Sequence, residues 1–142
     1  SIRRQRQMCI RDRYNNTMSC SPEIFGANPA NVKWQVVRGD TATIRVEFFE
    51  NDEATAFDTS GWQFASTTYD FRGDVLDELE VSAGNGYVDI TASAEITDFW
   101  GTGYSSTVAE LAFDLQVTID DTIWTPVIGT ITVLGDVTGG SL

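Results

Sequence analysis

Apolar and polar residues alternate without a break from Leu111 to Ile119. The large apolar residues in this stretch are Leu111, Phe113, Leu115, Val117 and Ile119. Successive side chains of a β-strand point to opposite faces, so this period of two predicts a long strand with one apolar face. Asp120-Asp121 interrupts the pattern and residues 122–133 resume it, which indicates a hairpin with a short loop. Pro126 has no N–H for the ladder and predicts an edge or a bulge.

The same alternation predicts further strands at about 32–37, 41–49, 62–71, 76–81 and 87–91. Turn residues separate them, as in Arg38-Gly39-Asp40 and in the stretch from Asp58 to Gly61. Ser93 is a suitable N-cap for a helical turn over Ala94–Phe99, the one helix expected. About seven to nine strands with almost no helix predict an all-β fold. We expect an antiparallel two-sheet β-sandwich, immunoglobulin-like, with one short helical turn.

Length and charge narrow the function classes. The 142 residues suit a single domain, and no apolar run approaches the ~20 residues that span a bilayer, so membrane insertion is not expected. The net charge is −12, although five of the nine basic residues lie in the first thirteen positions. Such an acidic surface repels phosphate, which argues against a nucleic-acid partner. Whether acidic loops bind Ca²⁺ stays open, because no D-x-[DN]-x-[DN]-G loop is present.

The first residues are unlike the rest of the chain. Residues 3–12 resemble, position by position, one translated reading frame of a transposase adapter used in sequencing libraries. We therefore expect residues 1–17 to be a non-native or disordered leader. Residues 18–31 then form an extended N-terminal arm, 32–138 the β-sandwich domain and 139–142 a flexible tail. Cys9 belongs to the leader, so Cys20 is expected to stand alone, without an internal disulfide and in a reducing compartment.

Candidate chemistry is sparse. The chain has no histidine, which excludes Ser–His and Cys–His catalysis. No carboxylate pair is singled out for glycosidase chemistry, so we predict no catalytic, cofactor-binding or metal-binding residues and no enzymatic activity. Trp34 and Trp62 are expected in the core. Trp100, Tyr104 and Trp124 lie near predicted turns and could form an exposed aromatic surface that stacks on sugar rings.

Four short segments recur in a familiar order. They are residues 38–41 (RGDT), 58–62 (DTSGW), 113–117 (FDLQV) and 129–138 (GTITVLGDVT). In this order they resemble the β-sandwich modules of tailed-phage tail-fibre or baseplate minor virion proteins, the LtfC-like group. The resemblance covers about residues 32–138, and Thr59 and Ser60 depart from the usual D-L-T-G.

The resemblance implies a non-enzymatic virion structural module, assembled in the host cytoplasm, that docks other virion proteins without a cofactor. It leaves open a homo-oligomer. The alternative function is a carbohydrate-binding β-sandwich that contacts host surface glycans.

Overall fold

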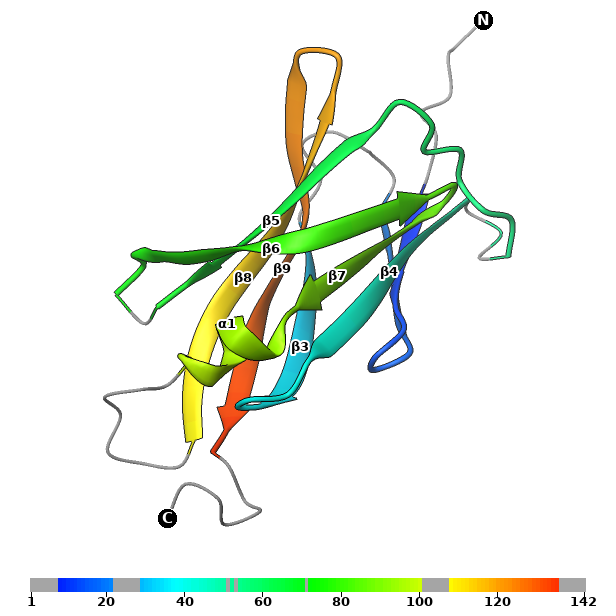
Figure 1. Ribbon diagram of the computed structural model, residues 1–142. Coiled ribbons are helices and arrows are strands. Elements are labelled where there is room, and N and C mark those ends of the chain that lie inside the picture. The colour runs from blue at the N-terminus through cyan, green and yellow to red at the C-terminus, as the bar shows by residue number, and fades with distance from the viewer. Residues whose placement is uncertain are drawn as a thin grey trace, which may run out of the picture.

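The computed structural model describes residues 8–21, 29–50, 52, 54–70, 72–100 and 108–135. These residues form nine strands and one short helix (Figure 1). In chain order they are β1 (Met8–Asp12), β2 (Thr17–Ser21), β3 (Ala30–Val37), β4 (Ala42–Glu50), β5 (Gln63–Tyr69), β6 (Val75–Gly84), β7 (Tyr87–Ala92), α1 (Ala94–Asp98), β8 (Val108–Ile119) and β9 (Thr122–Leu134). No helix in the described ranges is long and apolar enough to cross a membrane.

The strands form one continuous sheet that folds around a core. The all-β prediction is confirmed, but the expected division into two separate sheets is not observed. The hydrogen-bonded order is β2-β1-β4-β7-β6-β5-β8-β9-β3. Strand β6 makes the sheet continuous, because its first half pairs with β5 and its second half with β7. The two ends of the sheet approach each other at the β1–β2 turn, where Asn15 Nδ2 donates to the Lys33 carbonyl of β3 over 2.6 Å. The result is a nearly closed, barrel-like sheet.

The connectivity is nevertheless immunoglobulin-like. Without β2 and β3, one half of the sheet has the order β1-β4-β7-β6 and the other the order β5-β8-β9. Immunoglobulin constant-type domains place their first, second, fifth and fourth strands in one layer and the third, sixth and seventh in the other. The seven strands follow that scheme in chain order. Strand β3 differs from the expected antiparallel pattern, because it pairs in parallel with β9.

The β8–β9 hairpin confirms the strongest sequence pattern. The turn falls at Asp120-Asp121, and Leu111, Phe113, Leu115 and Val117 of β8 are buried. The register shifts at the position of Pro126, where two residues of β9 face Gln116 alone, so the predicted bulge is present.

Aromatic residues fill much of the core. Trp34 makes an edge contact with Phe113, with ring centroids 5.8 Å apart. At the other end of the core Phe48 of β4 contacts Trp62, with centroids 5.4 Å apart. Trp34 is buried, as expected, and Trp62 is partly buried against the same core. The Phe48–Trp62 contact connects the two halves of the sheet, whereas Trp34 and Phe113 belong to β3 and β8, which flank β9 in the same half.

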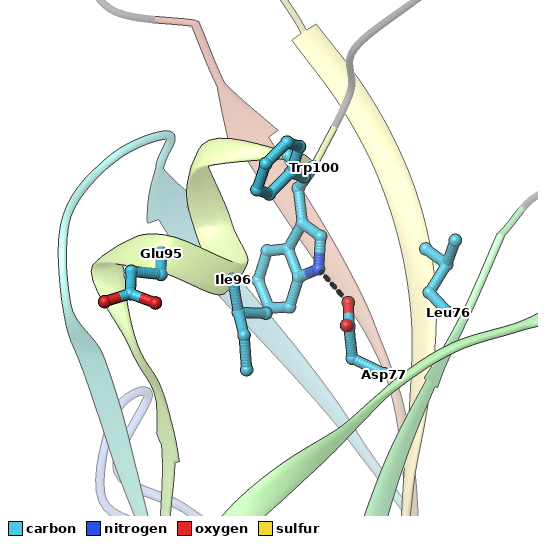
Figure 2. A pocket seen from close by; sticks show the side chains of 6 residues that line it. Leu76, Asp77, Glu95, Ile96 and Trp100 are labelled. Atoms are coloured by element: carbon cyan, nitrogen blue, oxygen red, sulfur yellow. Dashed lines mark hydrogen bonds between the residues drawn. The ribbon is translucent and has the colours of Figure 1, made fainter.

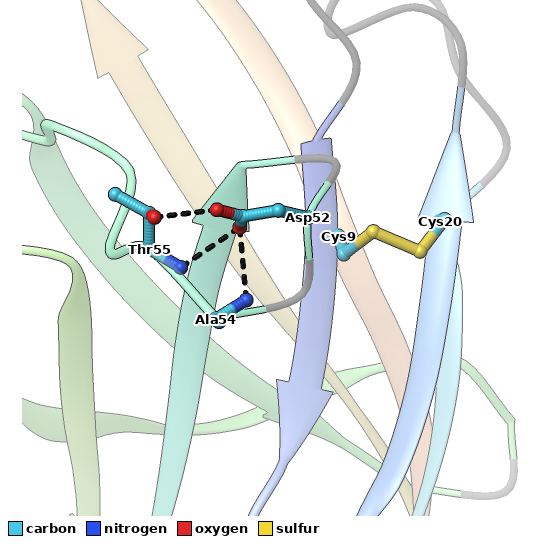
Figure 3. Close-up of a disulfide and its surroundings, with 5 residues drawn as sticks. All are labelled: Cys9, Cys20, Asp52, Ala54 and Thr55. Carbon is cyan, nitrogen blue, oxygen red and sulfur yellow. Dashed lines mark hydrogen bonds between the residues drawn. A yellow bond between two sulfur atoms is a disulfide. The ribbon is translucent and has the colours of Figure 1, made fainter.

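Residues 8–12 of the expected non-native or disordered leader form an ordered strand, so the disordered alternative does not hold for this part of it. Strand β1 pairs along its whole length with β4 on one side and with β2 on the other. Figure 3 shows the disulfide between Cys9 and Cys20, which stand directly opposite each other in the β1–β2 hairpin. The prediction that Cys20 stands alone is therefore wrong. The expectation of a reducing compartment depended on that prediction and loses its support. The adapter origin of residues 3–12 stays a prediction.

The predicted turn chemistry at residues 58–62 is confirmed. Asp58 Oδ1 accepts from the Ser60 backbone N–H over 3.1 Å and from its hydroxyl over 2.7 Å. The buried Thr59 hydroxyl accepts from Gly86 N over 2.8 Å and donates to the Gly84 carbonyl over 3.3 Å. Through these two hydrogen bonds, Thr59 connects this turn to the β6–β7 turn. These hydrogen bonds stabilise the fold.

Candidate functional site

Helix α1 is fixed in place by its caps and by one threonine. Ser93 is the N-cap, as predicted, and its Oγ accepts from Ile96 N over 3.3 Å. The buried Thr97 hydroxyl donates to the Asp40 carbonyl over 2.7 Å and accepts from Gly39 N over 3.1 Å. The β3–β4 turn therefore anchors the helix at one end of the sheet, as Figure 1 shows.

A β-bulge brings a second element to the same end. Asp77 pairs with Thr68 and Val75 pairs with Tyr69, so Leu76 between them has no partner in β5. An extra residue of this kind bends a strand and redirects its side chains. As a result two consecutive apolar side chains are exposed, Val75 by 64% and Leu76 by 41%.

Trp100 joins the helix end to β6. Its indole is only 2% exposed, and its Nε1–H donates to Asp77 Oδ2 over 3.0 Å. Figure 2 shows the indole between Ile96 of the helix and Asp77 of β6, with Leu76 beyond it. This hydrogen bond orients one carboxylate beside an apolar wall, and it satisfies the polar atom of a buried indole.

These elements enclose an open pocket of about 420 Å³, which we name the α1 pocket. Its lining consists of Leu76, Asp77, Glu95, Ile96, Phe99 and Trp100. Four of these six residues are apolar and two are acidic. The Phe99 side chain is 73% exposed at the rim. Chemically the pocket can accept an apolar group and a positive charge together.

Three basic residues elsewhere in the described chain already form ion pairs with carboxylates. Arg45 on β4 bonds to both oxygens of Asp89 on β7, at 2.7 and 2.9 Å, and its guanidinium lies 4.0 Å from the Tyr87 ring centroid. The hydrogen bond to Asp89 raises the pKa of Arg45. Arg11 contacts Glu47 at 2.9 Å and Arg13 contacts the same oxygen at 3.3 Å. Within the described part of the chain, the residues that line the α1 pocket include no positive partner of this kind.

The predicted aromatic surface does not form. Trp100 and Trp124 are 2% and 6% exposed, so their expected exposure is wrong. The reason for Trp124 is its place on β9 opposite the buried Val117, which directs the indole into the core against Trp62. Tyr104 lies outside the described residues. Trp100 does belong to the pocket, but as part of its wall.

The sequence pattern did not predict the exposed apolar residues at the pocket. Two signals could have indicated them. One is the adjacent pair Val75-Leu76, which breaks the alternation of β6, and the other is Phe99 beside Trp100 at the end of a capped helical turn. Among the described residues no three histidine, cysteine, aspartate or glutamate side chains gather as a metal site.

Comparisons with known proteins give distant similarities of structure only. No family model and no curated protein matches the sequence. A titin M10–obscurin-like 1 immunoglobulin complex covers 76% of this chain and 90% of its own at 12% identity and a TM-score of 0.42. A chimeric titin Z1Z2 covers 77% and 91% at 13% identity and a TM-score of 0.39. A family 123 glycoside hydrolase from Clostridium perfringens covers 74% of this chain and 23% of its own, at 10% identity and a TM-score of 0.44. We take no function from similarities at this level.

Proposed function

We propose that this chain is a non-enzymatic virion structural module of a tailed phage, associated with a tail fibre or baseplate, whose function is to dock another protein. The phage assignment is supported by the ordered segments that resemble the LtfC-like group. Two of these segments, 113–117 and most of 129–138, lie in the β8–β9 hairpin at the centre of the core. On this proposal the protein is located in the virion, and its partners are other virion proteins.

The observation that carries the docking function is the apolar rim of the α1 pocket. Val75, Leu76 and Phe99 expose large apolar side chains at one end of a sheet whose interior is otherwise well packed. Leu76 and Phe99 line the α1 pocket and Val75 precedes Leu76 in the chain, and exposed large apolar side chains beside a pocket are typical of protein contact sites. A rigid scaffold with a contact patch at one end is what a docking module needs.

The glycan-binding alternative receives less support. It depended on an exposed aromatic platform of Trp100, Tyr104 and Trp124. Both tryptophans are buried. Stacking on a sugar requires an accessible ring face. Phe99 is the exposed aromatic residue near the pocket, and it keeps the alternative open to the test below.

Immunolabelling of purified particles tests the proposal. Antibody raised against the folded chain and visualised by negative-stain microscopy should decorate the tail tip or fibres of the phage that encodes it. Particles from which the gene has been deleted are the control. Absence of the chain from purified particles would contradict a virion role.

A further inference from the structure

We propose that the α1 pocket binds a lysine or arginine side chain that an apolar segment of the partner protein presents. This inference rests on the proposed docking function, and it names the chemistry by which the pocket recognises the partner. It follows from the charge of the lining, from the apolar rim and from the size of the pocket.

The charge of the pocket favours a cation. Asp77 and Glu95 contribute two carboxylates, and none of the lining residues that the structure describes is basic. No ion pair among the described residues involves either carboxylate, whereas Glu47 and Asp89 on the outer face of β4 and β7 are paired with arginines. The two carboxylates lie on opposite sides of Ile96 and the Trp100 indole in Figure 2, so a cation that binds at one of them is also attracted by the negative charge of the other.

The apolar rim favours a long side chain over a simple ion. Lysine and arginine place three or four methylene groups along apolar surface while the charged head reaches a carboxylate. Leu76 and Phe99 offer such surface at the rim. The volume of about 420 Å³ lies in the range of small-ligand sites, and it exceeds what a bare ion requires.

A second copy of the chain fits the pocket less well. Three of the basic residues that the structure describes, Arg11, Arg13 and Arg45, already form ion pairs with carboxylates. The net charge of −12 also makes two copies repel each other. The charge complementarity points to a partner of different composition, with basic and apolar residues next to each other.

A peptide titration by NMR tests the inference. The probe is a capped tripeptide, leucine–arginine–leucine, added to the ¹⁵N-labelled full chain at low salt. We expect shifts at the backbone amides of α1 and at the Trp100 indole N–H. The same peptide with citrulline, a neutral isostere of arginine, should bind roughly two- to fivefold more weakly, which is the range of an exposed charge pair.

Two matched variants identify the carboxylates. Glu95→Gln removes one of the two pocket charges and should weaken binding of the arginine peptide part of the way toward that of the citrulline peptide, because Asp77 remains. Glu78→Gln removes an exposed charge on the other face of β6, next to Asp77, and should leave the affinity unchanged. Unchanged amide shifts elsewhere in both spectra show that both variants fold.

The outcomes separate the inference from the function on which it rests. Equal affinity for both peptides, or an equal effect of both variants, overturns the cation site but leaves docking through the apolar rim intact. Shifts at the pocket with methyl glucoside and none with the arginine peptide overturn it in favour of a glycan. Particle labelling tests the docking function independently of these titrations.

Discussion

The contact of Gly129 with β3 and β8 offers a sharp test of the core. Gly129 stands directly opposite Phe113. A Cβ added at 129 would lie 2.2 Å from the Val32 carbonyl oxygen and 2.4 Å from Phe113 Cε1, where ordinary contact begins at 3.4 Å. In Gly129→Ala the parallel strand β3 and the Phe113 ring must therefore each give way by roughly 1 Å.

Neither group can move cheaply. The carbonyl belongs to the backbone of β3, and the ring is buried against Trp34. Overpacking of a core costs about 1–3 kcal/mol, and we expect Gly129→Ala to lose about 3 kcal/mol of unfolding free energy. That is a large part of the ~5–15 kcal/mol that holds a typical domain.

Urea unfolding followed by circular dichroism measures the loss. The matched control is Ile128→Ala, on the neighbouring solvent-facing position, which is 40% exposed and should cost about 1 kcal/mol or less. A Gly129→Ala chain within about 0.5 kcal/mol of the parent would refute the packing described for β3, β8 and β9.

Three further predictions concern single contacts. Thr59→Val should cost about 1–3 kcal/mol in urea unfolding, because the buried Gly86 N–H loses its acceptor; Thr59→Ser should keep most of that stability, and equal losses would be inconsistent with the hydrogen bond. Burial and the hydrogen bond to Asp114 raise the pKa of Tyr69, so its contribution to stability is present below about pH 10 and falls as the pH rises through the folded pKa. The parent should therefore lose more stability than Tyr69→Phe in alkaline melts, and parallel profiles would contradict this. Reduction of Cys9–Cys20 should lower the unfolding free energy by up to about 3 kcal/mol, whereas the Cys9→Ser/Cys20→Ser chain should not respond to reductant.

The sequence pattern predicted those strands whose two faces differ in burial. The alternation of β8 and β4 follows the core, and the N-cap at Ser93 marks the helix correctly. The pattern could not show that β6 pairs with strands in both halves of the sheet. Alternation of apolar and polar residues reports which face of a strand is buried, but it does not report which strands are its hydrogen-bond partners. Nor could it show that β3 runs parallel to β9.

The errors at the amino end and at the site have separate physical causes. Cys9 and Ile10 are buried because β1 completes the edge of β4, a tertiary effect that outweighs the basic composition of this segment. Proximity to a turn was a poor guide to exposure for Trp100 and Trp124, since the direction of a side chain depends on its place in the strand or helix. The bulge at Leu76 created the exposed rim, and a bulge depends on the register with the neighbouring strand.

Hydroxyl-radical footprinting of the chain inside intact particles, compared with the isolated chain, tests the docking claim most directly. Phe99 is 73% exposed beside the α1 pocket, and Ile123 is 64% exposed at the tip of the β8–β9 hairpin, at the opposite end of the molecule in Figure 1. We predict that oxidation of Phe99 and Leu76 falls sharply in the particle while that of Ile123 is unchanged. Protection of Ile123 with full oxidation of Phe99 and Leu76 would contradict docking through the α1 pocket.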